Sequence, residues 1–199
     1  FSGWRSIFGI LSAYAALLIG ILVWQLPESH PPHRRIKRSP WAGYATVLKH
    51  RVARRYILML ASAYSGMFVF ITASPYLYLE HFEQNEQTFP WLFGANVIVI
   101  MLMNRLNIFW LRHWSPQRLL TAGILLQFAS ALALLLLALS PYFKLPVVLP
   151  LLMIYVGSLG LITANTMGTV MQYFREVAGS ATALMGVIQF SGGALAAKA

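Results

Sequence analysis

The chain contains no cysteine and no aspartate, and only 10% of its 199 residues are charged. The absence of cysteine excludes a disulfide framework, a thiolate metal site and a cysteine nucleophile. A soluble domain of this length carries charge on about a quarter of its residues. Together with the 58% of hydrophobic residues, the shortage of charge favours a protein that is surrounded by lipid.

Six long apolar stretches fill most of the chain. Five of them contain no charged residue, and the third contains only Arg105. The stretches are 7–26, 56–79, 89–111, 119–143, 145–174 and 177–197. A helix of about 20 apolar residues crosses the hydrocarbon core of a bilayer, and a helix pairs its backbone polar groups within the segment. We predict an all-α, polytopic transmembrane helical bundle with six spans.

Basic residues gather in the connector 27–55, between the first two stretches. Eight of the fifteen Lys and Arg residues lie there: Arg34, Arg35, Lys37, Arg38, Lys49, Arg51, Arg54 and Arg55. The next connector, 80–88, holds Glu80, Glu83 and Glu86 and no Lys or Arg. Because positively charged connectors stay in the cytoplasm, we predict a cytoplasmic linker at 27–55. The net charge of +10 then reflects the positive-inside bias of membrane proteins, and the basic patch would also attract anionic lipid headgroups. We expect no nucleic-acid partner.

Motifs for catalysis and cofactor binding are missing from the sequence. There is no His-Glu-x-x-His metal motif, no Gly-x-Ser-x-Gly nucleophile elbow and no phosphate-binding loop. The apolar stretches contain no histidine. We therefore expect no enzyme activity, no catalytic residue, no cofactor and no metal site. All five Glu residues lie in connectors or at the ends of stretches, so none sits at membrane depth, where proton-coupled transporters carry a titrating carboxylate.

The second stretch carries Tyr64, Phe68, Thr72 and Tyr76 at four-residue spacing. Residues with this spacing share one face of a helix. Large aromatic rings with a hydroxyl suit a cavity for flat, lipophilic compounds. These four residues are therefore candidate substrate contacts, and ordinary helix packing is the alternative.

The fifth stretch carries Asn165, Thr169 and Gln172 on one helical face. Polar side chains within lipid face the protein interior or a water-filled cavity. We treat these three residues as further candidate substrate contacts. Hydrogen bonds to a neighbouring helix are the alternative.

Four glycines and one proline are candidates for packing and gating. Gly157, Gly160, Gly168 and Gly179 are small enough to let two helices approach closely. Pro75 lacks an N–H, so the carbonyl four residues earlier loses its helical donor. This predicts a kink, which either gates a transport path or is simply tolerated.

Four separate segments resemble one transporter family. They are Gly3-Trp4-Arg5 with Phe8, then Leu26-Pro27-Glu28-Ser29, then Ser65-Gly66-Met67-Phe68 through Ser74-Pro75-Tyr76, and finally Ala178-Gly179-Ser180-Ala181 through Gln189-Phe190. In this order they resemble the Bcr/CflA branch of the drug/proton antiporters in the major facilitator superfamily. The third connector departs from the family, because Asn107 is followed by Ile108, Phe109 and Trp110 where the family carries Arg residues.

The resemblance implies that the chain covers helices six to eleven of a twelve-helix transporter. Its second stretch would then line the central cavity, and the proton-coupling group would lie in the N-terminal half. The start at Phe1 and the end at Ala199, inside an apolar run, also lead us to expect a partial chain. The expected divisions are 1–26 for the last helix of the N-terminal half, 27–55 for the linker, and 56–199 for most of the C-terminal half. Its five helices are expected at 56–79, 89–111, 119–140, 147–174 and 177–199.

Our hypothesis is a monomeric secondary active transporter in the bacterial inner membrane. It would export drugs or other small amphipathic compounds by proton antiport with alternating access, so its partners would be a small-molecule substrate, protons and lipid. A sugar or metabolite exporter of the same fold is one alternative. A membrane scaffold that transports nothing is the other.

Overall fold

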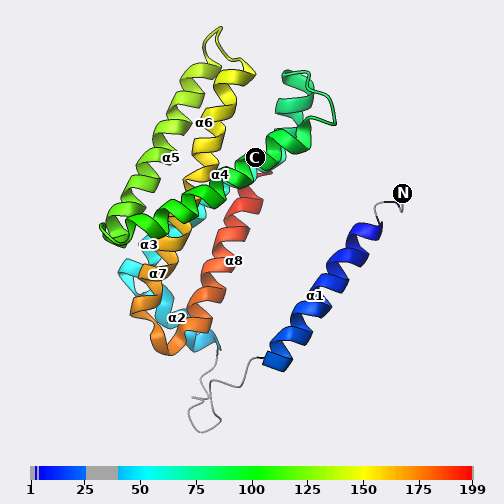
Figure 1. The fold of residues 1–199 in the computed structure, drawn as a ribbon. Coiled ribbons are helices and arrows are strands. Elements are labelled where there is room, and N and C mark those ends of the chain that lie inside the picture. The colour runs from blue at the N-terminus through cyan, green and yellow to red at the C-terminus, as the bar shows by residue number, and fades with distance from the viewer. Residues whose placement is uncertain (1–2, 4, 26–39, 199) are drawn as a thin grey trace. The chain divides into compact units, whose positions relative to one another are not determined.

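The computed structural model describes residues 3, 5–25 and 40–198 (Figure 1). The first part of the predicted linker, 27–39, lies outside the described residues, as do Trp4 and the whole family-like segment Leu26-Pro27-Glu28-Ser29. The chain divides into two compact units, Phe1–Arg38 and Ser39–Ala199. We describe each unit by itself.

The first unit is a single described helix, α1, which runs from Arg5 to Gln25. None of its described side chains is buried, and most of its exposed residues are large and apolar. Its 21 residues are long and apolar enough to cross a membrane. The composition of α1 therefore matches the first predicted span.

The second unit contains the other helices. These are α2 (Pro40–Lys49), α3 (Arg51–Pro75), a π-helical segment (Tyr76–His81), α4 (Phe89–Trp110), α5 (Pro116–Ala138), α6 (Leu145–Gly157), α7 (Leu159–Tyr173), a short 3-10 helix (Arg175–Val177) and α8 (Ala178–Ala196). The described residues are almost entirely helical, which confirms the predicted all-α class. α3 packs most extensively against α8, while α5 packs against α6 and α7.

Five described helical segments are long and apolar enough to cross a membrane: α1, α3 with its π-helical extension, α4, α5, and α6 continued by α7. The predicted sixth span forms α8, which is a complete helix of 19 residues. α8 is not among the five, because glycine, serine, threonine and glutamine dilute its apolar residues. The six predicted spans therefore correspond to six helical segments. Five of these segments are long and apolar enough to cross a membrane.

The helix bounds differ from the expected ones by a few residues at several ends, and two differences concern local structure. α3 begins at Arg51, inside the segment 27–55, and the imidazole of His50 caps it by accepting from the Ala53 N–H at 3.3 Å. The predicted helix 147–174 is two helices that meet at Ser158. The Ser158 hydroxyl donates to the Tyr155 carbonyl at 2.6 Å. Hydropathy does not predict either feature, because it contains no information on local hydrogen bonds.

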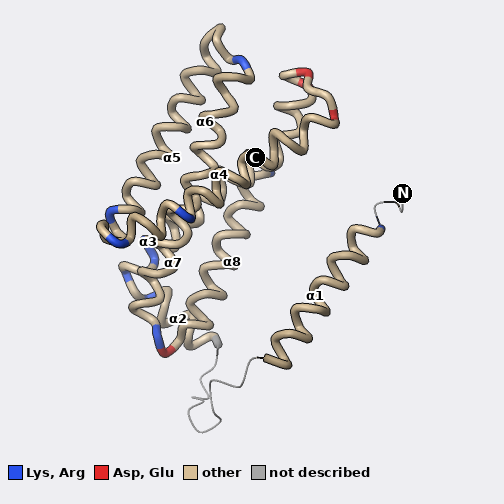
Figure 2. Tube along the Cα trace, in the orientation of Figure 1, with Lys and Arg blue, Asp and Glu red and all other residues tan. Residues whose placement is uncertain are grey.

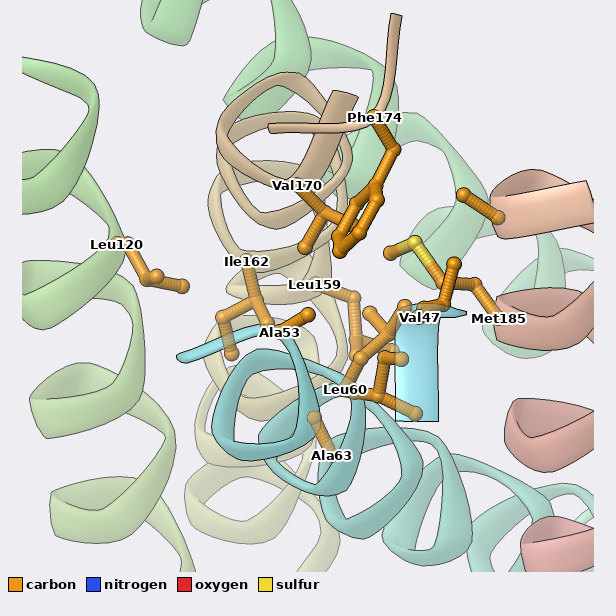
Figure 3. Packing of buried hydrophobic residues seen from close by; sticks show 12 residues of the cluster. Val47, Ala53, Leu60, Ala63, Leu120, Leu159, Ile162, Val170, Phe174 and Met185 are labelled. Atoms are coloured by element: carbon orange, nitrogen blue, oxygen red, sulfur yellow. The ribbon is translucent and has the colours of Figure 1, made fainter. Parts of the chain in front are cut away.

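Apolar side chains fill the interior of the second unit in two clusters. Figure 3 shows the first cluster, in which Leu60, Ile162, Val170 and Met185 from α3, α7 and α8 meet. The second cluster lies around Phe70, Tyr78, Val148, Leu152 and Val156. In lipid these contacts stabilise the fold through close packing rather than through removal of water.

Charge is unevenly distributed along the second unit. The acidic residues Glu80, Glu83 and Glu86 precede α4, while Arg112 and Arg118 follow it. Figure 2 shows these opposite charges at opposite ends of α4. A helix of 22 residues is about 33 Å long, so the two groups are separated by the thickness of a bilayer core.

Candidate substrate cavity

The surface of α7 differs in composition from that of α5. Most of α7 is buried. Apart from Tyr173 at its end, its exposed residues are small or polar, at Ala164, Gly168 and Gln172, and Thr163 is partly exposed. Beyond its first turns, which expose Gln117, Arg118 and Thr121, the large side chains that α5 and its C-cap expose are apolar: Leu125, Phe128, Leu132, Leu135, Leu136 and Leu139. An apolar face is typical of contact with lipid, and a small, polar face is typical of contact with a water-filled path. The small and polar face of α7 therefore indicates the side of the bundle on which a substrate path would lie.

A cavity of about 350 Å³ lies on that side, between α3, α4 and α7. Its lining residues are Tyr64, Met67, Ile100, Asn104, Leu159, Gly160, Thr163 and Ala164. The Thr163 hydroxyl donates to the Tyr64 hydroxyl at 3.3 Å, which links α7 to α3 at the wall. None of the lining residues is charged. The cavity falls within the usual range for small-molecule sites, about 300–1,000 Å³, and has their mixture of apolar walls and a few polar groups.

An aromatic cluster lies beside the cavity, between α3 and α8. The ring of Phe190 lies edge-on to Phe68, with centroids 5.9 Å apart, and to Tyr64, at 6.3 Å. Edge-to-face contacts of this kind are favourable. The ring of Phe68 also occupies the space that a side chain on Gly193 would need. Phe190 remains 56% exposed, so the cluster offers an aromatic surface to a ligand.

A second hollow, of about 440 Å³, opens between α3, α5 and α6. It is larger, but its walls include the exposed apolar side chains of Leu58, Met59 and Phe128. Gln127 and Tyr155 are among its few polar residues. Because this apolar rim is typical of a lipid-facing groove, the smaller cavity is the better candidate for a substrate.

The predicted stripe on α3 separates into two parts. Tyr64 and Phe68 are half-buried and lie at the cavity and its aromatic cluster. Thr72 and Tyr76 are exposed, and neither lines the cavity. Tyr76 begins the π-helical segment, whose different periodicity ends the four-residue pattern.

Asn165 and Thr169 lie in the interior rather than at the cavity. Asn165 Nδ2 donates to Asn107 Oδ1 on α4 at 2.7 Å and to the Leu161 carbonyl at 2.8 Å. The Thr169 hydroxyl donates to the Asn165 carbonyl at 2.7 Å. Of the two interpretations of Asn165, the structure shows the hydrogen bond between helices. Gln172 is exposed near the end of α7 and does not line the cavity either.

The four glycines also separate into two pairs. A side chain on Gly157 would meet Val99, and one on Gly160 would lie 3.0 Å from the Asn104 nitrogen and the Ile100 carbonyl. Both glycines therefore let α4 approach closely. Gly168 and Gly179 have no such neighbours within 4 Å, so the close helix contact expected there is absent.

Pro75 is followed at once by the π-helical segment. The Ser74 hydroxyl donates to the Ile71 carbonyl at 2.9 Å, which is the carbonyl that the proline leaves without its usual partner. A neighbouring side chain therefore supplies a donor to this carbonyl, and the predicted kink stays a prediction. Whether the proline gates transport stays a prediction.

Apart from Tyr64, Phe68 and Gly160, sequence reasoning did not select the residues of the site, and Thr163 and Phe190 show why. Thr163 is one of several polar residues in α7, close to Asn165 and Thr166, and no spacing within α7 marks it as a partner of Tyr64. Phe190 lies on α8, and its contacts with α3 depend on how two helices pack. The only available signal was that Phe190 falls in a family-like segment.

The sequence model of the Major Facilitator Superfamily matches residues 1–197. The chain is 23% identical over 198 residues to a protein of Haemophilus influenzae named bicyclomycin resistance protein homolog, with 98% of this chain and 50% of the relative covered. It is 26% identical over 196 residues to an uncharacterized MFS-type transporter of Bacillus subtilis, with 94% of this chain and 47% of the relative covered. The chain thus spans about half the length of these curated relatives. No solved structure matches it.

Proposed function

Because the chain belongs to the major facilitator superfamily, we propose that the intact protein exports drugs or other small amphipathic compounds across the bacterial inner membrane. The predicted resemblance to Bcr/CflA-type exporters is confirmed by the relative that is named for bicyclomycin resistance. The observation that carries the proposal is the uncharged cavity between α3, α4 and α7, with aromatic rings at its edge.

The chemistry of this cavity favours amphipathic substrates over sugars. Tyr64, Met67, Ile100 and Leu159 provide apolar or aromatic surface, while the polar groups are few. A sugar needs a hydrogen-bond partner for most of its hydroxyls, and a buried hydroxyl without a partner costs free energy. A sugar or metabolite exporter remains the second candidate, because Asn104 is one amide at the wall. A scaffold would have no use for a cavity of this kind.

The proposed mechanism is alternating access, in which two helix bundles rock about a site near the middle of the membrane. α4 and α7 would belong to one rigid bundle, since they are joined by Asn107 and Asn165. Proton antiport needs a titrating group at membrane depth. This chain has no Asp, and its Glu residues lie in connectors or at helix ends. The proposal therefore assigns proton coupling to the half of the full-length relatives that this chain does not cover.

Dye efflux tests the proposal. Cells that express the intact protein are loaded with a fluorescent cationic dye, and efflux is followed with and without a protonophore. We expect efflux that the protonophore abolishes. Efflux that persists with the protonophore would refute proton coupling. The absence of efflux in both conditions would refute the export of such compounds and favour the metabolite or scaffold alternatives.

Substitutions in the cavity test where the substrate binds. Phe68→Ala removes aromatic surface, and we expect the KM for dye efflux to rise about tenfold, the usual loss for one apolar contact. Tyr64→Phe keeps the ring but removes the hydroxyl that Thr163 contacts, so a smaller rise is expected. Phe128→Ala on the apolar face of α5 is the matched control and should leave the KM unchanged. An equal rise in KM for Phe68→Ala and Phe128→Ala would refute the assignment of the cavity as the binding site.

A further inference from the structure

Two adjoining hollows lie where α4 turns into α5, away from the substrate cavity. The first, of about 280 Å³, is lined by Trp110, Trp114, Leu119, Ala122 and Leu161. The second, of about 390 Å³, is lined by Trp114, Gln117, Arg118, Thr121, Ala122 and Leu125. They share Trp114 and Ala122. An apolar slot therefore continues into a shelf that carries a guanidinium, an amide and a hydroxyl.

The charge around these hollows is positive. Arg112 lies in the turn itself and Arg118 lines the shelf, and both are exposed. Neither forms an ion pair with a described residue. The acidic connector 80–88 precedes α4, about 33 Å away along the helix, where salt screens its charge. The shelf is thus complementary to an anion.

The surroundings indicate a membrane interface. Tryptophan is enriched where the hydrocarbon core meets water, and Trp110 and Trp114 stand at the end of α4 and in the turn. Beyond the shelf, the exposed face of α5 continues with Leu125, Phe128 and Leu132, which suits acyl chains. Arginine at such a position extends its charge toward the headgroups. A ligand here meets apolar wall on one side and positive charge on the other.

We propose that this bipartite hollow binds one anionic phospholipid, with an acyl chain in the slot of Trp110 and Leu161 and the phosphate against Arg118 and Arg112. Positively charged connectors in general attract anionic membranes. What the structure adds is a shaped site beside the charge. Leu161 belongs to α7 and its carbonyl accepts from Asn165, so a bound lipid contacts α4, α5 and α7 together and stabilises their packing.

Native mass spectrometry tests the proposal on the intact protein in detergent. It is mixed with phosphatidylglycerol or with phosphatidylcholine of the same acyl chains, and the fraction that retains lipid is compared. We expect preferential retention of phosphatidylglycerol. One basic residue near a lipid surface contributes about 1 kcal/mol, or about fivefold in binding. Arg118→Gln should lower the preference about fivefold, and the double variant with Arg112→Gln about twenty-five-fold.

Two controls separate a specific site from general attraction. Lys144→Gln removes one positive charge from the α5–α6 connector, at the other end of α5, and should leave the preference unchanged. Ala122→Phe keeps every charge but fills the slot, and should lower the retention of phosphatidylglycerol. Thermal unfolding, measured with each lipid, checks that each variant is folded and that phosphatidylglycerol raises the Tm of the unaltered protein more than that of Arg118→Gln.

Three results would overturn the proposal. Equal retention of the two lipids would show that charge does not select the ligand. An equal effect of Lys144→Gln and Arg118→Gln would show that only net charge matters. Displacement of the lipid by inorganic phosphate alone would show a site for a free anion. None of these three results changes the result of the efflux assay. The lipid proposal and the proposed export function can therefore fail independently.

Discussion

The hydrogen bond between Asn107 and Asn165 gives the most informative test of how α4 and α7 are joined. Both side chains are 2% exposed. Asn165 Nδ2 has two N–H groups, and it uses them on Asn107 Oδ1 and on the Leu161 carbonyl. Replacing Asn165 therefore removes the donor that joins the two helices. It also leaves the Asn107 oxygen buried without its partner.

The expected magnitudes follow from these partners. A side-chain hydrogen bond within a membrane protein contributes about 0.6 kcal/mol on average and up to about 1.7 kcal/mol. A buried polar group that loses its partner costs about 1–3 kcal/mol. We expect Asn165→Leu and Asn107→Leu each to lower the free energy of unfolding by about 1–2 kcal/mol. The double variant should cost less than the sum, by a coupling energy of about 0.6–1.7 kcal/mol.

The measurement is a double-mutant cycle, with reversible unfolding of the intact protein in mixed detergent micelles. Gln127→Leu is the matched control, since the buried Gln127 amide nitrogen has no hydrogen-bond partner. Its replacement should be neutral or stabilising. A coupling energy within about 0.3 kcal/mol of zero, the usual error of additivity, would refute the reasoning. So would a cost for Gln127→Leu equal to that for Asn165→Leu.

The same variants decide between the two interpretations of Asn165. If Asn165 only joins the helices, its replacement and that of Asn107 change stability together and change the KM for dye efflux to the same small extent. If Asn165 contacts the substrate when the helices move, Asn165→Leu raises the KM and Asn107→Leu does not. The first result is the one that the buried pair predicts.

Hydropathy alone predicts the helices because lipid imposes both their length and their composition. It does not predict the break at Ser158, since Leu145–Tyr173 as a whole is long and apolar enough to cross a membrane as one segment. At the break, the Ser158 hydroxyl donates to the Tyr155 carbonyl, and α4 approaches closely at Gly157 and Gly160. A count of apolar residues predicts neither the hydrogen bond nor the close approach of α4.

Helical periodicity locates faces only approximately. Asn96, Asn104 and Asn107 look as though they share a face of α4, yet Asn96 and Asn107 are buried and Asn104 lines the cavity. Residues three apart in an α-helix differ by about 60° around its axis, and this difference separates the interior from the cavity. Asn96 donates to the Leu92 carbonyl of its own helix, whereas Asn107 accepts from Asn165, which lies 58 positions away on another helix. Predicting such contacts requires knowledge of how the whole bundle packs.

Two further pairs of substitutions test the packing beside the cavity and the end of α3. Gly160→Ala places a methyl group 3.0 Å from backbone atoms of α4 and should cost about 1–3 kcal/mol in the unfolding assay; Gly168→Ala, with open space around its methyl group, should be neutral or stabilising, and equal effects would contradict this account. Ser74 is 1% exposed, and its hydroxyl donates to the carbonyl of Ile71 that Pro75 leaves without a backbone donor. Ser74→Ala therefore strands a buried acceptor and should cost about 1–2 kcal/mol. Adding Pro75→Ala restores an N–H four residues beyond that carbonyl, so the double variant should recover most of the loss. If the double variant is no more stable than Ser74→Ala alone, the hydroxyl does not stand in for the missing amide.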